Sequence, residues 1–110
     1  MEDEITYKIL KAIEGNPSYT QRQLSQELGV SLGKLNYCLK ALIDKGWVKG
    51  SNFKNNPNKS EYLYLLTPAG MEAKAKVTLR FLKRKVGEYE RIRKEIADLE
   101  IESRQDHKLV

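Results

Sequence analysis

The residues best suited to chemistry lie in one short stretch, where polar and basic side chains recur at helical spacing. An apolar stripe between residues 31 and 45 predicts a helix that buries one face. Asparagine can pair with adenine through two hydrogen bonds, lysine suits guanine edges or phosphates, and tyrosine can contact a thymine methyl group. The pattern therefore predicts contact with duplex DNA through the opposite face, which carries Ser31, Gly33, Lys34, Asn36, Tyr37 and Lys40.

Two further segments are candidates for contact with the same partner. Arg22 lies in the first turn of a second predicted helix, where the helix dipole and free N–H groups favour a phosphate. Residues 53–60 are rich in Asn, Lys and Pro and predict a polar hairpin tip. Lysines at such a tip add counterion release, although a solvated hairpin without DNA contact is the alternative interpretation. The candidate contacts of the tip are Lys54, Asn55, Asn56 and Lys59.

Other kinds of chemistry lack their usual residues. The sequence has no Gly-rich phosphate loop, no Cys/His cluster and no serine with a base at a recognisable spacing. Cys38 is the single cysteine and adjoins the apolar stripe, which favours a core thiol over a redox sensor. His107 is the single histidine and lies in the expected tail, where a lone histidine indicates neither a zinc site nor a catalytic base. We therefore expect no enzymatic activity, metal site or cofactor, and no small-molecule effector is evident.

Three short helices are predicted to hold the polar face in place. The first covers residues 3–14, and Thr20 opens the second with a capping box. Gly29 ends the second helix, and Ser31 caps a third that runs to about Lys45. Two helices joined by so tight a turn are typical of a helix-turn-helix. The residues expected to bury the third helix are Leu32, Leu35, Leu39, Leu42 and Ile43.

A hairpin and a long helix are predicted to follow. Residues 47–51 and 61–66 predict two antiparallel strands, which form a wing beside the helix-turn-helix. Thr67 and Pro68 then restart a helix, as cap and first helical residue. The expected fold is therefore mainly α with a small β-hairpin, a winged helix-turn-helix followed by a long C-terminal helix.

The long helix carries a narrow apolar seam on a charge-rich background. Its spacing is typical of a coiled coil and predicts dimerisation. The seam consists of Leu79, Leu82, Val86, Tyr89, Ile92, Ile96 and Leu99. We expect a DNA-binding domain over residues 1–70, a dimerisation helix over 71–103 and a frayed tail over 104–110.

Charge is distributed unevenly along the 110 residues. The net charge of +5 is concentrated in residues 67–87, whereas residues 88–110 are net −2. A basic balance favours a polyanionic partner, but the run over 74–85 suits a solvated coiled-coil surface equally well. No apolar run approaches the ~20 residues that a membrane span needs, and the acidic start does not resemble a signal peptide. A cytoplasmic location is expected.

The order of these elements resembles the MarR family of winged-helix transcription regulators. The residues that carry the resemblance are 16–50, NPSYTQRQLSQELGVSLGKLNYCLKALIDKGWVKG, and 63–76, LYLLTPAGMEAKAK, with its "LT-x-x-G" restart after the wing. The closest subgroup is the short one associated with exopolysaccharide loci. Larger members dimerise through N- and C-terminal helices around a ligand crevice. Here only one long helix follows the wing, so small-molecule sensing is not carried over.

Together the residues and the resemblance predict a homodimeric, sequence-specific DNA-binding transcription regulator. The resemblance further implies control of exopolysaccharide or capsule genes. An alternative is a winged-helix adaptor whose C-terminal helix pairs with another protein. The exposed face of the third helix favours the first interpretation, because an adaptor tends to present apolar or acidic residues there.

Overall fold

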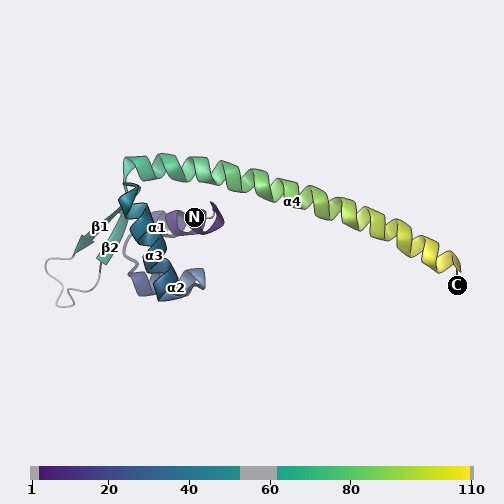
Figure 1. Cartoon of the computed structure of the whole chain (residues 1–110), viewed down its shortest axis with the longest axis horizontal. Coiled ribbons are helices and arrows are strands. Elements are labelled where there is room, and N and C mark those ends of the chain that lie inside the picture. The colour runs from purple at the N-terminus through teal and green to yellow at the C-terminus, as the bar shows by residue number, and fades with distance from the viewer. Residues whose placement is uncertain (1–2, 53–61, 110) are drawn as a thin grey trace.

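Three short helices pack around one apolar core. They are α1 (Asp3–Gly15), α2 (Gln21–Leu28) and α3 (Leu32–Asp44), seen in a computed structural model that describes residues 3–52 and 62–109 (Figure 1). Apolar residues at helical spacing on each helix meet in this core, and its fully buried side chains from α1 to α3 are Ile9, Leu10, Ile13, Leu24, Leu35, Leu39 and Leu42. The predicted class, mainly α with a small hairpin, is confirmed.

The helix ends form where the sequence places capping residues. The Thr20 hydroxyl accepts a hydrogen bond from the Gln23 N–H at 3.3 Å, and the Gln23 side chain accepts one from the Thr20 N–H at 2.8 Å. Gly29 ends α2 in the left-handed region with φ 66°, and the Ser31 hydroxyl then caps α3. The Gly29 N–H donates to the Gln26 carbonyl and the Ser31 hydroxyl accepts the Lys34 N–H, so both sides of the turn between α2 and α3 satisfy groups that the helices cannot pair internally.

The buried stripe of α3 is narrower than the sequence predicts. Leu32 and Ile43 were expected inside, but they are 44% and 41% exposed. Each helical residue advances by about 100°, which places both at the edge of the stripe, next to Asn36. Cys38 takes a core position instead, 3% exposed, so the prediction of a core thiol is confirmed.

The hairpin consists of β1 (Val48–Asn52) and β2 (Tyr62–Leu66), antiparallel, with Val48 opposite Leu66. The first strand was predicted to begin at Trp47. In the structure the Trp47 N–H still bonds the Leu42 carbonyl at 3.0 Å, which keeps this residue in the turn that ends α3. The pairing therefore starts one residue later.

A close contact joins the end of the hairpin to the last helix, α4 (Pro68–Leu109). The Thr67 N–H donates to the Trp47 carbonyl at 3.0 Å, and the Thr67 hydroxyl accepts the Gly70 N–H at 3.0 Å. A Cβ on Gly70 would overlap the Trp47 carbonyl oxygen. The "LT-x-x-G" pattern thus provides a helix cap and a residue without a side chain where two backbones meet.

The helix α4 extends far beyond the core (Figure 1). Its 42 residues correspond to about 63 Å of helix. The end predicted near residue 103 is not observed, because the helix continues without interruption to Leu109. Within the described residues, no helix is long and apolar enough to cross a membrane.

Only the first turns of α4 pack on the body of the molecule, and α1 provides most of that surface. Val77 is 1% exposed, and the Phe81 ring stacks on Tyr7 with centroids 5.0 Å apart. The Arg80 guanidinium donates to both carboxylate oxygens of Asp3, at 3.1 and 3.3 Å. This hydrogen bonding lowers the pKa of Asp3 below its ordinary 3.8. An apolar contact and an ion pair thus fix the direction of α4.

Replacing Gly70 should test the contact between the hairpin and α4. In Gly70→Ala the new methyl group meets the Trp47 carbonyl, and such overpacking costs about 1–3 kcal/mol. Gly87→Ala is the matched control, since its Cβ meets nothing and alanine favours a helix by up to about 1 kcal/mol. Urea unfolding should show opposite signs for the two variants. Equal effects would contradict the close approach.

Acid should weaken the link between Asp3 and Arg80. A carboxylate with a lowered folded-state pKa contributes stability above its unfolded pKa and loses that contribution as pH falls through the folded value. Asp3→Asn should therefore be less stable than the native chain near neutral pH, and the difference should vanish well below pH 3.8. Urea unfolding at several pH values measures this. Gln26→Ala, at an exposed uncharged position of α2, is the control, and its effect should not depend on pH in this way.

Candidate nucleic-acid interface

One face of α3 lies open to solvent while the other is buried. Gly33, Asn36, Tyr37 and Lys40 are all exposed, Tyr37 to 76%. Leu32 joins them as an apolar neighbour that sequence analysis had assigned to the core. The face therefore offers amide, hydroxyl, ammonium and apolar groups together, which are the groups that base edges and thymine methyls require.

Ser31 and Lys34 lie at the start of α3 but differ from this group. The Ser31 hydroxyl is the N-cap and accepts the Lys34 N–H at 3.1 Å. The Lys34 side chain lines a shallow hollow with Glu4, Ile5 and Lys8 of α1. Lys34 is exposed, yet it lies on the α1 side of the helix, about 160° around from Asn36.

A hydrogen bond between α2 and α3 involves the residue best suited to pair with adenine. The Gln21 side-chain amide donates to Asn36 Oδ1 at 2.9 Å, which leaves Asn36 Nδ2 as the outward donor. Pairing with adenine needs both the oxygen and the nitrogen of the amide, and the oxygen has two lone pairs, so it can accept from adenine while Gln21 still donates to it. Sequence analysis did not select Gln21; its place in the first turn of α2 was the only signal.

The start of α2 lies beside this bond. Thr20 and Gln23 are committed to the capping box. The N–H groups of Gln21 and Arg22 belong to the first turn, which has no acceptor within the helix. Arg22 is exposed, so its guanidinium and these N–H groups are available to an anion near the α3 face.

The wing tip falls outside the described residues. The candidate contacts predicted there are Lys54, Asn55, Asn56 and Lys59, and they remain predictions. The described strands fix only the base of the hairpin, next to the end of α3.

Most of the basic run in α4 is already paired. Lys74 lies 3.1 Å from Glu14, and Arg80 and Arg84 lie 3.1 and 3.8 Å from Asp3. Within α4, Lys76 pairs with Glu72 and Lys85 with Glu88. Most positive charge of this segment is thus balanced by nearby carboxylates. Of the two interpretations of the run, the pairing favours a structural surface over a phosphate contact.

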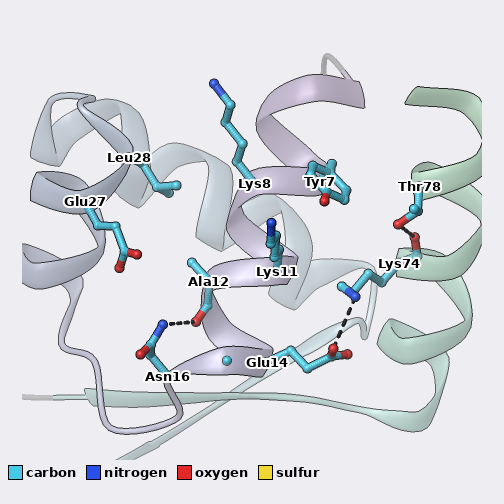
Figure 2. Close-up of a pocket in the computed structure, with 11 residues that line it drawn as sticks. Tyr7, Lys8, Lys11, Ala12, Glu14, Asn16, Glu27, Leu28, Lys74 and Thr78 are labelled. Carbon is cyan, nitrogen blue, oxygen red and sulfur yellow. Dashed lines mark hydrogen bonds and ion pairs between the residues drawn. The ribbon is translucent and has the colours of Figure 1, made fainter. Parts of the chain in front are cut away.

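A hollow of about 670 Å³ is lined by residues of α1, the end of α2 and the start of α4 (Figure 2). Its charged residues already have partners: Lys74 bonds Glu14, Lys8 pairs with Glu4, and Lys11 lies over the Tyr7 ring. Glu27, on the opposite wall, raises the pKa of Tyr19 through its charge. No group of three metal-ligating side chains occurs among the described residues.

The predicted seam of α4 is exposed along its whole length. Its seven residues are 51–61% exposed, although each is apolar or aromatic. Scattered exposed apolar residues are ordinary, but a continuous row along one helix marks a contact surface. The row is composed of Leu79, Leu82, Val86, Tyr89, Ile92, Ile96 and Leu99.

Comparison with known proteins identifies the first half of the chain. Residues 2–49 match a family model described as winged helix-turn-helix DNA-binding. The HTH-type transcriptional regulator Ptr1 of Methanocaldococcus jannaschii is 37% identical over 57 residues, which are 52% of this chain and 38% of Ptr1. Residues 2–49 thus resemble a DNA-binding module, and the chain spans well under half of that relative.

Solved structures share the fold over a longer stretch. A mutant MarR from E. coli in complex with operator DNA is 26% identical, with a TM-score of 0.59, over 74% of this chain and 73% of that one. FabT of Streptococcus pneumoniae in complex with DNA is 25% identical, with a TM-score of 0.60, over 76% of this chain and 57% of FabT. The winged helix-turn-helix fold is thereby shown, and the chain shares it with these two proteins.

Proposed function

We propose that this protein is a transcription regulator that binds duplex DNA through α3. The observation that carries the proposal is the open face of α3, which stays polar and basic while the opposite side is locked into the core. A helix held in this way can enter the major groove without losing its packing. Two of the structural neighbours, FabT and the mutant MarR, are complexes with DNA, which supports DNA as the partner.

The residues of the α3 face would make different contacts with the DNA. Asn36 and Tyr37 discriminate bases, Asn36 through its amide and Tyr37 through its ring or hydroxyl. Lys40 contacts a phosphate or a guanine edge, and Leu32 offers an apolar contact to a thymine methyl. Because Asn36 Oδ1 can accept two hydrogen bonds, the bond from Gln21 would hold the amide in place while it pairs with adenine.

Phosphate contacts would supply much of the affinity. Arg22 at the start of α2 and the lysines of the wing tip are the proposed contributors, and Lys34 adds charge beside the face. Each phosphate neutralised releases a counterion, so binding would weaken steeply with salt. Such contacts fix the register of the protein on the duplex, while α3 reads the sequence.

The working form would be a homodimer held by α4. The seven exposed side chains of the seam would be buried against the same seam of a second copy. Two α3 helices would then read a pseudo-palindrome. The resemblance of residues 16–50 and 63–76 to the exopolysaccharide-associated subgroup supports control of such genes, in the cytoplasm. The adaptor alternative gains no support from the polar α3 face.

Binding to a pool of random duplexes at two salt concentrations tests the role of α3. An inverted-repeat motif should be enriched by the native chain. Asn36→Ala should cost about 1–3 kcal/mol on that motif and relax one position of it. Lys40→Ala, if it contacts a phosphate, should weaken all sequences alike and reduce the salt slope by about 1.

Lys94→Ala is the matched control, because this lysine lies on the extended part of α4. It should leave both affinity and motif unchanged. Absence of enrichment at either salt concentration, with a folded dimer present, would reject DNA recognition and leave the adaptor alternative.

Sedimentation of the full chain tests the seam. Ile92→Glu introduces a charge into the proposed interface and should shift the dimer towards monomer. Ala97→Glu, about 140° around α4 from Ile92 and outside the seam, is the matched control and should leave the dimer intact. A dimer unaffected by Ile92→Glu would show that the interface lies elsewhere.

A further inference from the structure

The seam of α4 has a symmetry that bears on how two copies meet. Its steps of 3, 4, 3, 3, 4 and 3 residues read the same in both directions from Tyr89. In a two-fold dimer, if one residue of the first copy contacts a second residue of the other copy, the same two residues also meet with the copies exchanged. An axis through Tyr89 would therefore pair Leu79 with Leu99, Leu82 with Ile96 and Val86 with Ile92.

The spacing has a second consequence. Two successive steps of three residues interrupt the regular alternation at Tyr89. Such an interruption locally overwinds a coiled coil. With the axis at Tyr89, the interruption falls where the two copies cross, and each flank keeps a regular 3-4-3 pattern against its counterpart.

Charge distinguishes antiparallel from parallel pairing. Residues 72–83 carry four basic and one acidic side chain, whereas residues 95–106 carry one basic and five acidic ones. Antiparallel pairing about Tyr89 places these two segments side by side. Ion pairs with α1 and within α4 already balance most of the positive charge of residues 72–83, so the acidic segment discriminates. Parallel pairing would place residues 95–106 of the two copies, net −4 each, side by side, which is unfavourable. In both arrangements residues 84–94 of one copy lie along residues 84–94 of the other, so their charges do not distinguish antiparallel from parallel pairing.

The seam is also accessible beside the body of the molecule. Ala73 and Val77 are buried against the body, while Leu79 and Leu82 are more than half exposed. Two residues along a helix correspond to about 200° of rotation, so Leu79 points away from the side that buries Val77. A second helix can thus pack along the first turns of α4 without displacing α1.

We propose that two copies of α4 pair antiparallel about Tyr89, with residues 95–106 of each copy lying along residues 72–83 of the other. This inference rests on the proposed homodimer and gives it a polarity and a register. The two Val77 residues would lie about 36 Å apart along the rod, from 24 helical residues. That separation is similar to one turn of B-DNA between half-sites. In this arrangement α4 would act as a spacer between the two DNA-binding units.

Cross-linking of full-chain variants that each carry one added cysteine tests the polarity. Leu82→Cys and Ile96→Cys are prepared separately, treated with a short bismaleimide, and then treated again after mixing and subunit exchange. The native chain, whose Cys38 is buried, is the control for background reaction. Antiparallel pairing predicts a cross-linked dimer in the mixture and in neither variant alone, because equivalent positions would lie about 21 Å apart.

Every other pattern would overturn the inference. Cross-links in each variant alone would show parallel pairing, and a sedimenting dimer without cross-links in any sample would show a different register. A monomer in sedimentation would reject the homodimer itself. Binding of the native chain to the enriched duplex is measured separately, so failure of the polarity is distinguishable from failure of DNA recognition.

Discussion

The arrangement of this molecule depends on one backbone contact, between the Trp47 carbonyl and the first turn of α4. That oxygen accepts the Thr67 N–H, and Gly70 approaches it so closely that no side chain fits between them. Trp47 is the last residue of the turn that ends α3, while Thr67 directly follows β2. The contact therefore ties the DNA-facing helix, the hairpin and the long helix to one point, and the ion pair of Asp3 with Arg80 then fixes the direction in which α4 leaves.

This constraint changes the meaning of the charge pattern. The largest positive excess lies in residues 67–87, which by sequence alone is an attractive surface for nucleic acid. In the fold these residues face the acidic ends of α1, and Asp3 and Glu14 pair with them. Charge that is already balanced by nearby carboxylates contributes little to phosphate binding. The less basic α3 remains the better candidate because its polar groups are exposed. Among the described residues, nearly all of these groups lack a charged partner.

Much of the fold could be predicted because its signals are local. A capping box needs only Thr20 and Gln23 three residues apart, and a left-handed helix end needs only a glycine at residue 29. The seam of α4 is likewise visible as a spacing. Local signals were weaker at boundaries: Trp47 was assigned to a strand because its side chain suits one, whereas its N–H still bonds the end of α3.

The sequence by itself determined the order of the elements, the capped ends and the polar face of α3, since each depends on residues a few positions apart. The tertiary structure decided what depends on distant partners. Leu32 and Ile43 are exposed because the core does not reach the edge of the α3 stripe. Gln21 meets Asn36 across 15 positions of sequence, and Arg80 meets Asp3 across 77. The spacing of residues along the sequence does not reveal such pairs, because they form only when packing brings the helices together.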